Sequence, residues 1–255
     1  MYNTAVGSNA GIAVTTGVLN TLVGGLAGDA LTSGNNNAAL GYLALSADTL
    51  GDRNVAIGNN ALQSQNFTSS TDSYNTAVGF LAGGAVTTGV QNTLIGGLAG
   101  DALTDSDFNT AIGHLALTSD TLGSRSTAIG MNTLRDQNFT SGTETNNVAV
   151  GHGAGLKVTT GIQNTLIGAL AGDALTDADK NVAVGYGALT SDTLGSKSVA
   201  IGQFTLADQN FTSATDAFNT AVGFQAGSNV STGIQNVLIG GRTGDALTDA
   251  DHNVA

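Results

Sequence analysis

The chain has 255 residues, of which 41% are hydrophobic, 5% aromatic and 10% charged, and it contains 37 Gly but no Pro, Cys or Trp. The formal net charge of −12 argues against a nucleic acid partner, and the absence of cysteine excludes disulfide frameworks and cysteine zinc sites. The apolar fraction is too high for a disordered chain, and no run approaches the ~20 apolar residues of a membrane-spanning helix, so we expect no membrane insertion of this segment.

A short string, Asn-(Thr/Val)-(Ala/Leu)-aliphatic-Gly, recurs along the whole chain. Its starts are spaced by 17, 17, 17 and 21 residues, which add up to 72, and the same four spacings then repeat. Self-similarity at a fixed period is typical of solenoids, so we predict one continuous array over residues 1–255. The array divides into four-coil repeats at 3–74, 75–146 and 147–218, with a partial repeat at 219–255. The string begins at Asn3, Asn20, Asn37, Asn54, Asn75, Asn92, Asn109, Ser126, Asn147, Asn164, Asn181, Ser198, Asn219, Asn236 and Asn253.

Each coil is expected to contain one short strand at positions 2 to 4, counted from the Asn at position 1. These positions hold short and β-branched residues, which favour strands over helices, and position 5 is Gly in every complete copy. A 17-residue coil is too short for a pair of helices. We therefore predict an all-β fold, a parallel β-solenoid (β-roll) of about 14 stacked coils at a spacing of about 4.8 Å, with Asn forming an amide ladder along the stack.

The alternation within each strand predicts which side chains face the core. We expect the aliphatic residue at position 4 to point inward together with position 2, so that position 3 points outward. Position 3 is Ala in most coils and Leu in the second coil of each repeat. An exposed apolar column usually marks an interface, so we predict lateral association of identical chains through Leu22, Leu94, Leu166 and Leu238.

Both ends of the chain fall inside the repeat pattern, and 255 is not a multiple of 72. Uncapped solenoid ends expose strand edges that invite pairing. We therefore expect either a fragment of a longer chain, which the length favours, or a subunit that stacks end to end into a filament.

The second coil of each repeat is a weak candidate for calcium binding. Its Gly24–Thr32 string partly matches the calcium-binding nonapeptide, with Ala27 in place of the third glycine. Clustered aspartates at such spacing on a turn can hold Ca²⁺ through oxygen ligands, and a solvated acidic turn is the alternative. The candidate ligands are Asp101, Asp105, Asp107, Asp173, Asp177, Asp179, Asp245, Asp249 and Asp251.

The fourth coil is four residues longer than the others, and we expect its extra residues to form a protruding loop. Each loop contains Asn-Phe-Thr, a glycosylation acceptor pattern in an exported chain, and the candidate acceptors are Asn66, Asn138 and Asn210. The adjacent phenylalanines either pack back on the coil or contact a partner. They are Phe67, Phe139 and Phe211.

Residues that could support catalysis are sparse. His114, His152 and His252 have no counterparts in the other repeats, so we expect surface residues and not a metal site. No nucleophile elbow, phosphate-binding loop or dinucleotide motif appears, and we predict a chain that is not an enzyme and has no cofactor apart from the calcium candidate. A column of Thr at position 13, which includes Thr15 and Thr32, indicates either ice binding or a Thr ladder within the turns.

The repeat also resembles two groups of known proteins. Asn54–Gly58, Thr127–Gly130 and Ser198–Gly202 resemble the head repeats of trimeric autotransporter adhesins, and Asn75–Gly79 resembles repeats of phage and bacterial tail-fibre-like proteins. The resemblance covers essentially the whole chain, although the coils are longer here and the fourth has 21 residues. It implies a left-handed β-roll with three chains around one axis, on a cell surface or a virion.

The function implied by this resemblance is that of a structural or adhesive extracellular fibre segment. Some such heads bind matrix proteins, so a host-surface or matrix receptor is an expected partner alongside the identical chains of the homotrimer. A phage tail-fibre shaft or receptor-binding segment is the alternative.

Overall fold

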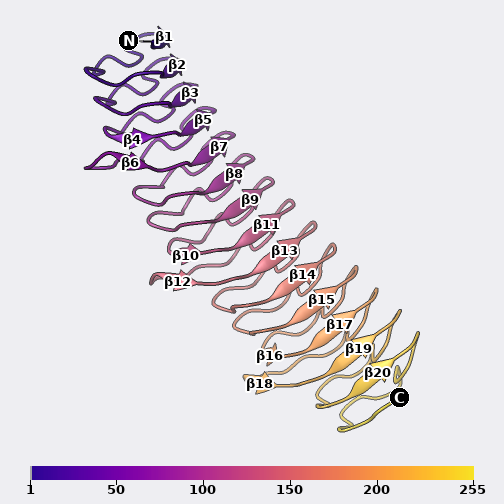
Figure 1. The fold of residues 1–255 in the computed structure, drawn as a ribbon. Helices are drawn as coiled ribbons and strands as arrows, with labels where there is room; N and C mark the ends of the chain where they lie inside the picture. The colour runs from indigo at the N-terminus through magenta and orange to yellow at the C-terminus, as the bar shows by residue number, and fades with distance from the viewer. Residues whose placement is uncertain (1) are drawn as a thin grey trace. The chain divides into compact units, whose positions relative to one another are not determined.

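The computed structural model describes residues 2–255, which form a parallel β-solenoid of about 14 coils. Short strands alternate with turns in every coil (Figure 1), and equivalent residues of consecutive coils lie 17 residues apart in most of the chain. The described residues contain no helix, and hence none that could cross a membrane. The predicted all-β solenoid and its coil length are confirmed.

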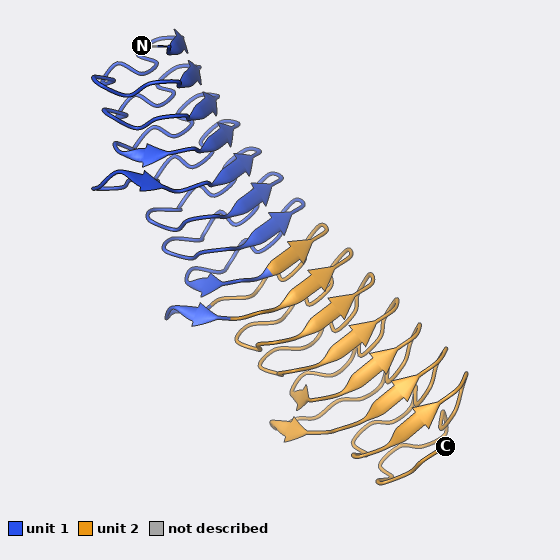
Figure 2. Ribbon diagram, in the orientation of Figure 1, with its two compact units in different colours: residues 1–126, 139–144 blue, residues 127–138, 145–255 orange. Residues whose placement is uncertain are grey.

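Two compact units make up the described chain (Figure 2). Unit 1 contains the residues up to Ser126 together with Phe139–Glu144, and unit 2 contains Thr127–Asn138 and Thr145–Ala255. The division falls inside the second 72-residue repeat, so the units do not coincide with the sequence repeats. One continuous array over residues 1–255 stays a prediction.

Each coil contributes one three-residue strand to a parallel sheet in which like positions pair. Thr76 pairs with Thr93, for example, and Val78 pairs with Ile95. Unit 1 has β1 (Thr4–Val6), β2 (Thr21–Val23), β3 (Ala38–Leu40), β5 (Val55–Ile57), β7 (Thr76–Val78), β8 (Thr93–Ile95) and β9 (Thr110–Ile112). Unit 2 has β11 (Thr127–Ile129), β13 (Val148–Val150), β14 (Thr165–Ile167), β15 (Val182–Val184), β17 (Val199–Ile201), β19 (Thr220–Val222) and β20 (Val237–Ile239).

The long fourth coil adds a second, two-stranded parallel sheet beside the main one. Residues of the added loop pair with the end of the preceding coil, so this loop is held by backbone hydrogen bonds. The short pairs are β4 (Gly51–Asp52) with β6 (Thr71–Asp72), β10 (Gly123–Ser124) with β12 (Thr143–Glu144), and β16 (Gly195–Ser196) with β18 (Thr215–Asp216).

Glycine at position 5 is required by the backbone and by the next coil. Gly96 has a φ of +135°, and a Cβ added to it would lie 2.5 Å from the carbonyl oxygen of Gly113. Residues with a side chain rarely adopt this φ. The recurring glycine therefore allows consecutive coils to stack at the spacing of paired strands, about 4.8 Å.

The two faces of the strand are the reverse of those predicted. Position 3 points into the coil: Leu94 is fully buried, whereas Thr93 and Ile95 on either side of it are only partly buried. The predicted inward orientation of positions 2 and 4 was wrong. The four leucines proposed as interface residues belong to the core of their own chain, with exposures of 0–1%: Leu22, Leu94, Leu166 and Leu238.

The physical reason is the small volume enclosed by a 17-residue coil. Position 9 is Gly in the first two coils of a repeat, and Leu at position 3 of the second coil fills the space beside both glycines. A Cβ added to Gly83 or Gly100 would lie within 2.8 Å of Leu94 side-chain carbons. Where position 9 is Leu, as at Leu117, position 3 is Ala, as at Ala111, and both are buried. Positions 3 and 9 together fill this part of the interior, and positions 2 and 4 lie on the outer side of the strand.

In the first three coils of a repeat, Asn at position 1 closes its coil and joins it to the next. The side-chain amide of Asn92 donates to the carbonyl oxygen of Ser106 in its own coil (2.7 Å), and its Oδ1 accepts the backbone N–H of Asn109 (2.9 Å). The predicted Asn column is confirmed, although side-chain-to-backbone bonds dominate it. Direct amide-to-amide bonds, such as Asn54 to Asn37 at 3.1 Å, accompany them.

Candidate interaction surface

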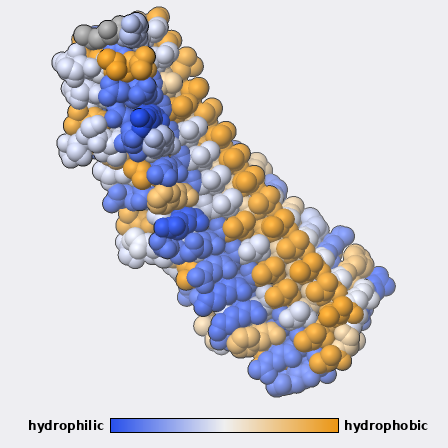
Figure 3. Space-filling view, viewed as in Figure 1, coloured by the Kyte–Doolittle hydropathy of each residue, from blue (hydrophilic) through white to orange (hydrophobic). Residues whose placement is uncertain are grey.

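The outward face of the main sheet is uncharged along every strand described. Position 2 is Thr, Val or Ala, and position 4 is Val, Ile or Leu. Hydrophobic residues gather in a stripe over the strands of each unit, with hydrophilic residues beside it (Figure 3). This stripe stands out in a chain with a net charge of −12, and an apolar surface of such length usually marks an interface. Its most exposed aliphatic members are Val6, Leu40, Ile129, Ile167, Ile201 and Ile239.

At position 6, some coils carry a large apolar side chain that widens the stripe, and the other coils carry Gly, Ala or a polar residue. About half of the surface of each large side chain is exposed, and in unit 2 the rings of Tyr186 and Phe204 pack edge to face at 5.2 Å. We call positions 2, 4 and 6 together the outer strand face. The large side chains at position 6 are Tyr42, Phe80, Met131, Tyr186 and Phe224.

Most of the aspartates proposed as calcium ligands accept hydrogen bonds from a neighbouring coil. Asp107 Oδ1 accepts the backbone N–H of Val90 in the preceding coil at 2.8 Å. Asp179 and Asp251 make the same bond to Ile162 and Ile234. Within residues 2–255, no group of three or more His, Cys, Asp or Glu side chains could hold a metal ion. Threonine hydroxyls donate to Asp101, Asp105, Asp173, Asp177 and Asp249, and Asp245 is partly exposed.

The Asn-Phe-Thr loops present their asparagine outward and bury their phenylalanine. Asn66, Asn138 and Asn210 are exposed, so each sequon lies at the surface, and glycosylation stays a prediction. The phenylalanines pack back on the coil, as one of the two interpretations predicted, with exposures of 5–7%. They are Phe67, Phe139 and Phe211.

A buried polar network anchors the fourth-coil loop, and the repeat motif alone does not reveal it. Asp48 Oδ2 accepts a hydrogen bond from Gln65 Nε2 (2.6 Å), and its Oδ1 accepts the backbone N–H groups of Gly51 (3.0 Å) and Phe67 (3.3 Å). Gln65 Oε1 accepts a bond from Asn75 Nδ2 (2.9 Å). Asp48 and Gln65 are fully buried.

Burial raises the pKa of the Asp48 and Asp192 carboxyl groups, because desolvation outweighs the hydrogen bonds that favour the ionised form. A sequence signal for this network exists at position 12, which runs Val, Leu, Asp, Gln within each repeat. The Asp and Gln stand where the other coils bury an aliphatic side chain, as at Val86 and Leu103.

The third coil of each complete repeat ends with a basic residue at position 17. This residue lies beside both an acidic side chain and an aromatic ring. Arg53 pairs with Asp72, and its guanidinium lies 5.3 Å from the centre of the Tyr74 ring. Lys197 pairs with Asp216 at 2.5 Å in the same way. These pairs are exposed and therefore contribute little to stability. Their main effect is on the shape of the surface around them.

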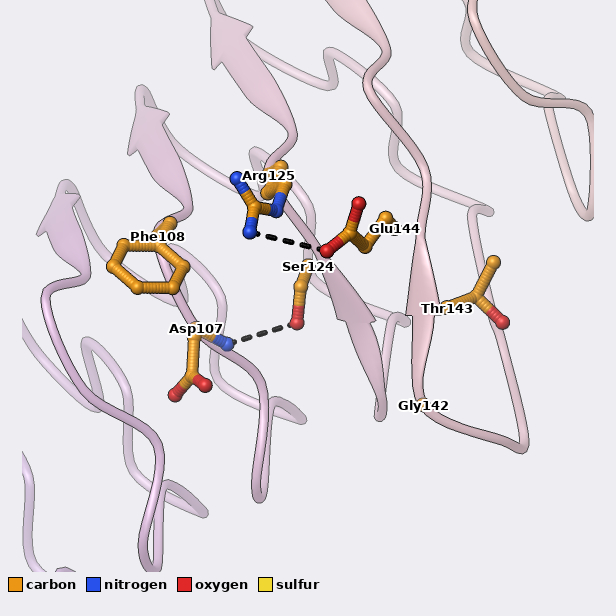
Figure 4. Close-up of a pocket in the computed structure, with 7 residues that line it drawn as sticks. All are labelled: Asp107, Phe108, Ser124, Arg125, Gly142, Thr143 and Glu144. Atoms are coloured by element: carbon orange, nitrogen blue, oxygen red, sulfur yellow. Dashed lines mark hydrogen bonds and ion pairs between the residues drawn. The ribbon is translucent and has the colours of Figure 1, made fainter.

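In unit 1 the corresponding arrangement around Arg125 forms a pocket of about 150 Å³ (Figure 4). Arg125 pairs with Glu144 at 3.0 Å and lies over the ring of Phe108 at 5.2 Å. The Asp107 backbone N–H donates to Ser124 Oγ at 3.0 Å across the floor. The pocket thus combines an aromatic ring, a cation, carboxylates and a hydroxyl.

The remaining candidate residues are the three histidines and the Thr column at position 13. His114, His152 and His252 are exposed and lie in different coils. At position 13, the hydroxyls of Thr15 and Thr32 each donate to a carbonyl oxygen of the next coil at 3.1 Å. This is the Thr ladder, so these hydroxyl groups serve the turns.

No family model, curated protein or solved structure matches this chain.

Proposed function

We propose that this chain is a non-catalytic structural segment of an extracellular fibre, in which three identical chains pack around one axis through their outer strand faces. The observation that carries the proposal is the uncharged, partly exposed stripe of Thr, Val and Ile along both units. Copies with a net charge of −12 repel one another. They approach at lowest cost where each surface is neutral and apolar.

The size of the outer strand face follows from the strand spacing. Seven strands about 4.8 Å apart, with outward columns spanning about 13 Å, give about 400 Å² in each unit. The two units together offer about 800 Å², which each chain of a trimer divides between two neighbours, with about 400 Å² for each. Aliphatic and aromatic side chains at positions 4 and 6 supply the apolar core that such an interface requires.

The shape of the coil favours a structural role over catalysis. Consecutive coils present the same columns, and the chemically distinct side chains are distributed over separate coils instead of meeting at one centre. A left-handed β-roll displayed on a cell or virion is the arrangement expected from the resemblance of the repeat, and its exposed sequon loops suit an exported chain.

Sedimentation equilibrium of the full chain tests the proposal. We expect a mass three times that of one chain, and we expect the double variant Ile95→Lys/Ile112→Lys to dissociate to single chains while keeping its β-type circular dichroism. The matched control Ser69→Lys/Ser141→Lys adds the same charge on exposed loops of unit 1 and should remain associated. A wild-type chain that sediments as a monomer, or a control that dissociates equally, would overturn the proposal.

A further inference from the structure

The pocket at Arg125 is built from three separate segments of unit 1. Asp107 and Phe108 precede β9, Ser124 and Arg125 lie at β10, and Gly142 leads into β12 with Glu144. Gly142 borders open space, because a Cβ added there would meet no atom within 4 Å. Figure 4 shows Phe108 and Glu144 on opposite sides of the pocket, with Arg125 between them.

This combination of residues occurs in one repeat only. The residues 72 positions before Phe108 and Gly142 are Asn36 and Ser70, and those 72 positions after them are Lys180 and Ala214. The equivalent loops of the other repeats therefore lack both the ring at this position and the gap in the rim. A feature that departs from an otherwise strict repeat is not needed to stack the coils.

The polar groups of the pocket are positioned without a ligand. Asp107 is held by the Val90 backbone N–H, and Arg125 is held by Glu144. Phe108 and Arg125 both have left-handed backbone, with φ of 60° and 65°, as do the residues that end the other coils. Groups that are already ordered lose little conformational entropy when a ligand binds.

The chemistry of the lining selects a class of ligand. Asp107 and Glu144 outnumber Arg125, so the pocket has a local charge of about −1 and disfavours anions. The carboxylates accept hydrogen bonds, Arg125 donates them, and the Ser124 and Thr143 hydroxyls can do both. The half-exposed Phe108 ring (44%) offers an apolar surface at one side.

We propose that this pocket binds a neutral pyranose, as a terminal or internal unit of a glycan. Hydroxyl groups of the sugar ring would bond to Glu144, Asp107 and Arg125, and the C–H face of the ring would lie on the exposed part of Phe108 that Arg125 does not cover. A volume of about 150 Å³ admits a single ring. The inference goes beyond the structural role proposed above and uses residues of unit 1 alone, so it stands or falls independently of the oligomeric state.

Saturation-transfer NMR and calorimetric titration of the full chain test this inference. The probes are methyl α-mannopyranoside, methyl α-glucopyranoside, methyl β-galactopyranoside and N-acetylglucosamine, with glucuronate as the anionic comparison. We expect at least one neutral sugar to bind with a Kd on the order of 1 mM, as suits a single small pocket. Glucuronate is expected to bind at least about tenfold more weakly, because the site is acidic.

Variants borrowed from the other repeats keep the fold and remove the pocket. Phe108→Asn and Gly142→Ser install the residues of the first repeat, and each should weaken sugar binding at least about tenfold with unchanged thermal unfolding. Phe218→Ala removes the aromatic ring beside Lys197 and should leave binding unaffected. The inference would be overturned if none of the neutral sugars bound, or if glucuronate bound more tightly than they do. It would also be overturned if Phe108→Asn bound the sugar as tightly as the wild type.

Discussion

Single residues at two kinds of position carry the tightest constraints of the coil. Glycine at position 5 combines a backbone that side chains disfavour with a carbonyl oxygen of the next coil in van der Waals contact. The buried aspartate at position 12 of the third coil holds the fourth-coil loop through its two oxygens. The constraint on the glycine is steric and that on the aspartate is electrostatic, so we expect different effects from replacing them.

Replacing Gly96 with Ala should lower stability markedly. The backbone conformation alone costs about 1–3 kcal/mol for a residue with a Cβ, and the contact at 2.5 Å to Gly113 forces the coils apart. Gly142→Ala is the matched control, because its added Cβ meets nothing within 4 Å and its φ is not positive. Thermal unfolding followed by circular dichroism measures the difference, and equal midpoints for the two variants would contradict the steric argument.

The pH dependence of stability should report the buried aspartates. Burial raises the folded-state pKa of Asp48 and Asp192 above the ordinary 3.8, so the folded chain binds protons more tightly than the unfolded chain. Their contribution to stability is therefore fully present below pH 3.8 and is lost as the pH rises through the raised pKa.

The comparison is between wild type and Asp48→Asn/Asp192→Asn. The wild type's advantage in unfolding midpoint should be greatest at acid pH and should shrink as the pH rises through the raised pKa. Asp105→Asn/Asp177→Asn, which changes exposed aspartates, serves as the control. An advantage that grows with rising pH would contradict the assignment.

At the scale of the element, adjacent residues of each strand face opposite sides, one toward the inside of the coil and the next toward its outer surface. Position 3 fills the coil, and positions 2 and 4 face outward. Adjacent residues of β8 should therefore respond to truncation in different assays.

Leu94→Ala should destabilise the folded chain by about 2–5 kcal/mol, because it leaves a cavity beside Gly83 and Gly100. Ile95→Ala removes a partly exposed side chain and should cost less in chemical denaturation of the dissociated chain, while weakening self-association. Denaturation at low protein concentration and sedimentation separate the two effects. A larger loss of folding stability from Ile95→Ala than from Leu94→Ala would contradict the assignment of the inner face.

For the whole molecule, stability should follow the 72-residue repeat and not the single coil. Neighbouring coils of a solenoid stabilise one another through their shared interfaces. Those interfaces are not identical here, since Leu at position 3 of the second coil fills space beside glycines of two coils, as Leu166 does at Gly155 and Gly172. Coils are therefore matched in sets of four.

Deletion of residues 147–218 should retain a cooperatively folded solenoid with a midpoint close to that of the full chain. The deletion joins a fourth coil to a first coil, as in the natural order. Deletion of residues 164–180 removes fewer residues but also removes Leu166 from beside Gly155, and it should lower the midpoint further. Thermal unfolding of both deletions is the measurement, and the opposite order would contradict matching in sets of four.

The sequence by itself determined the all-β class, the coil length, the strand positions, the obligatory glycine and the Asn column. Stacked coils place identical positions above one another, so any residue required by stacking must recur at a fixed interval, and periodicity is visible without coordinates. The same reasoning placed the sequons on surface loops, because an insertion into a regular coil has to protrude.

Only the tertiary structure decided which strand face is inside, which polar groups are buried and where a pocket forms. An alternating three-residue strand has apolar side chains on both faces, so its pattern is equally consistent with either orientation. The choice depends on how side chains fill the closed coil, where Leu at position 3 occupies the space beside Gly at position 9 and Ala at position 3 accompanies Leu at position 9. The Asp48 network and the Arg125 pocket likewise join residues 10 to 37 positions apart, and their proximity follows from the path of the chain around the coil.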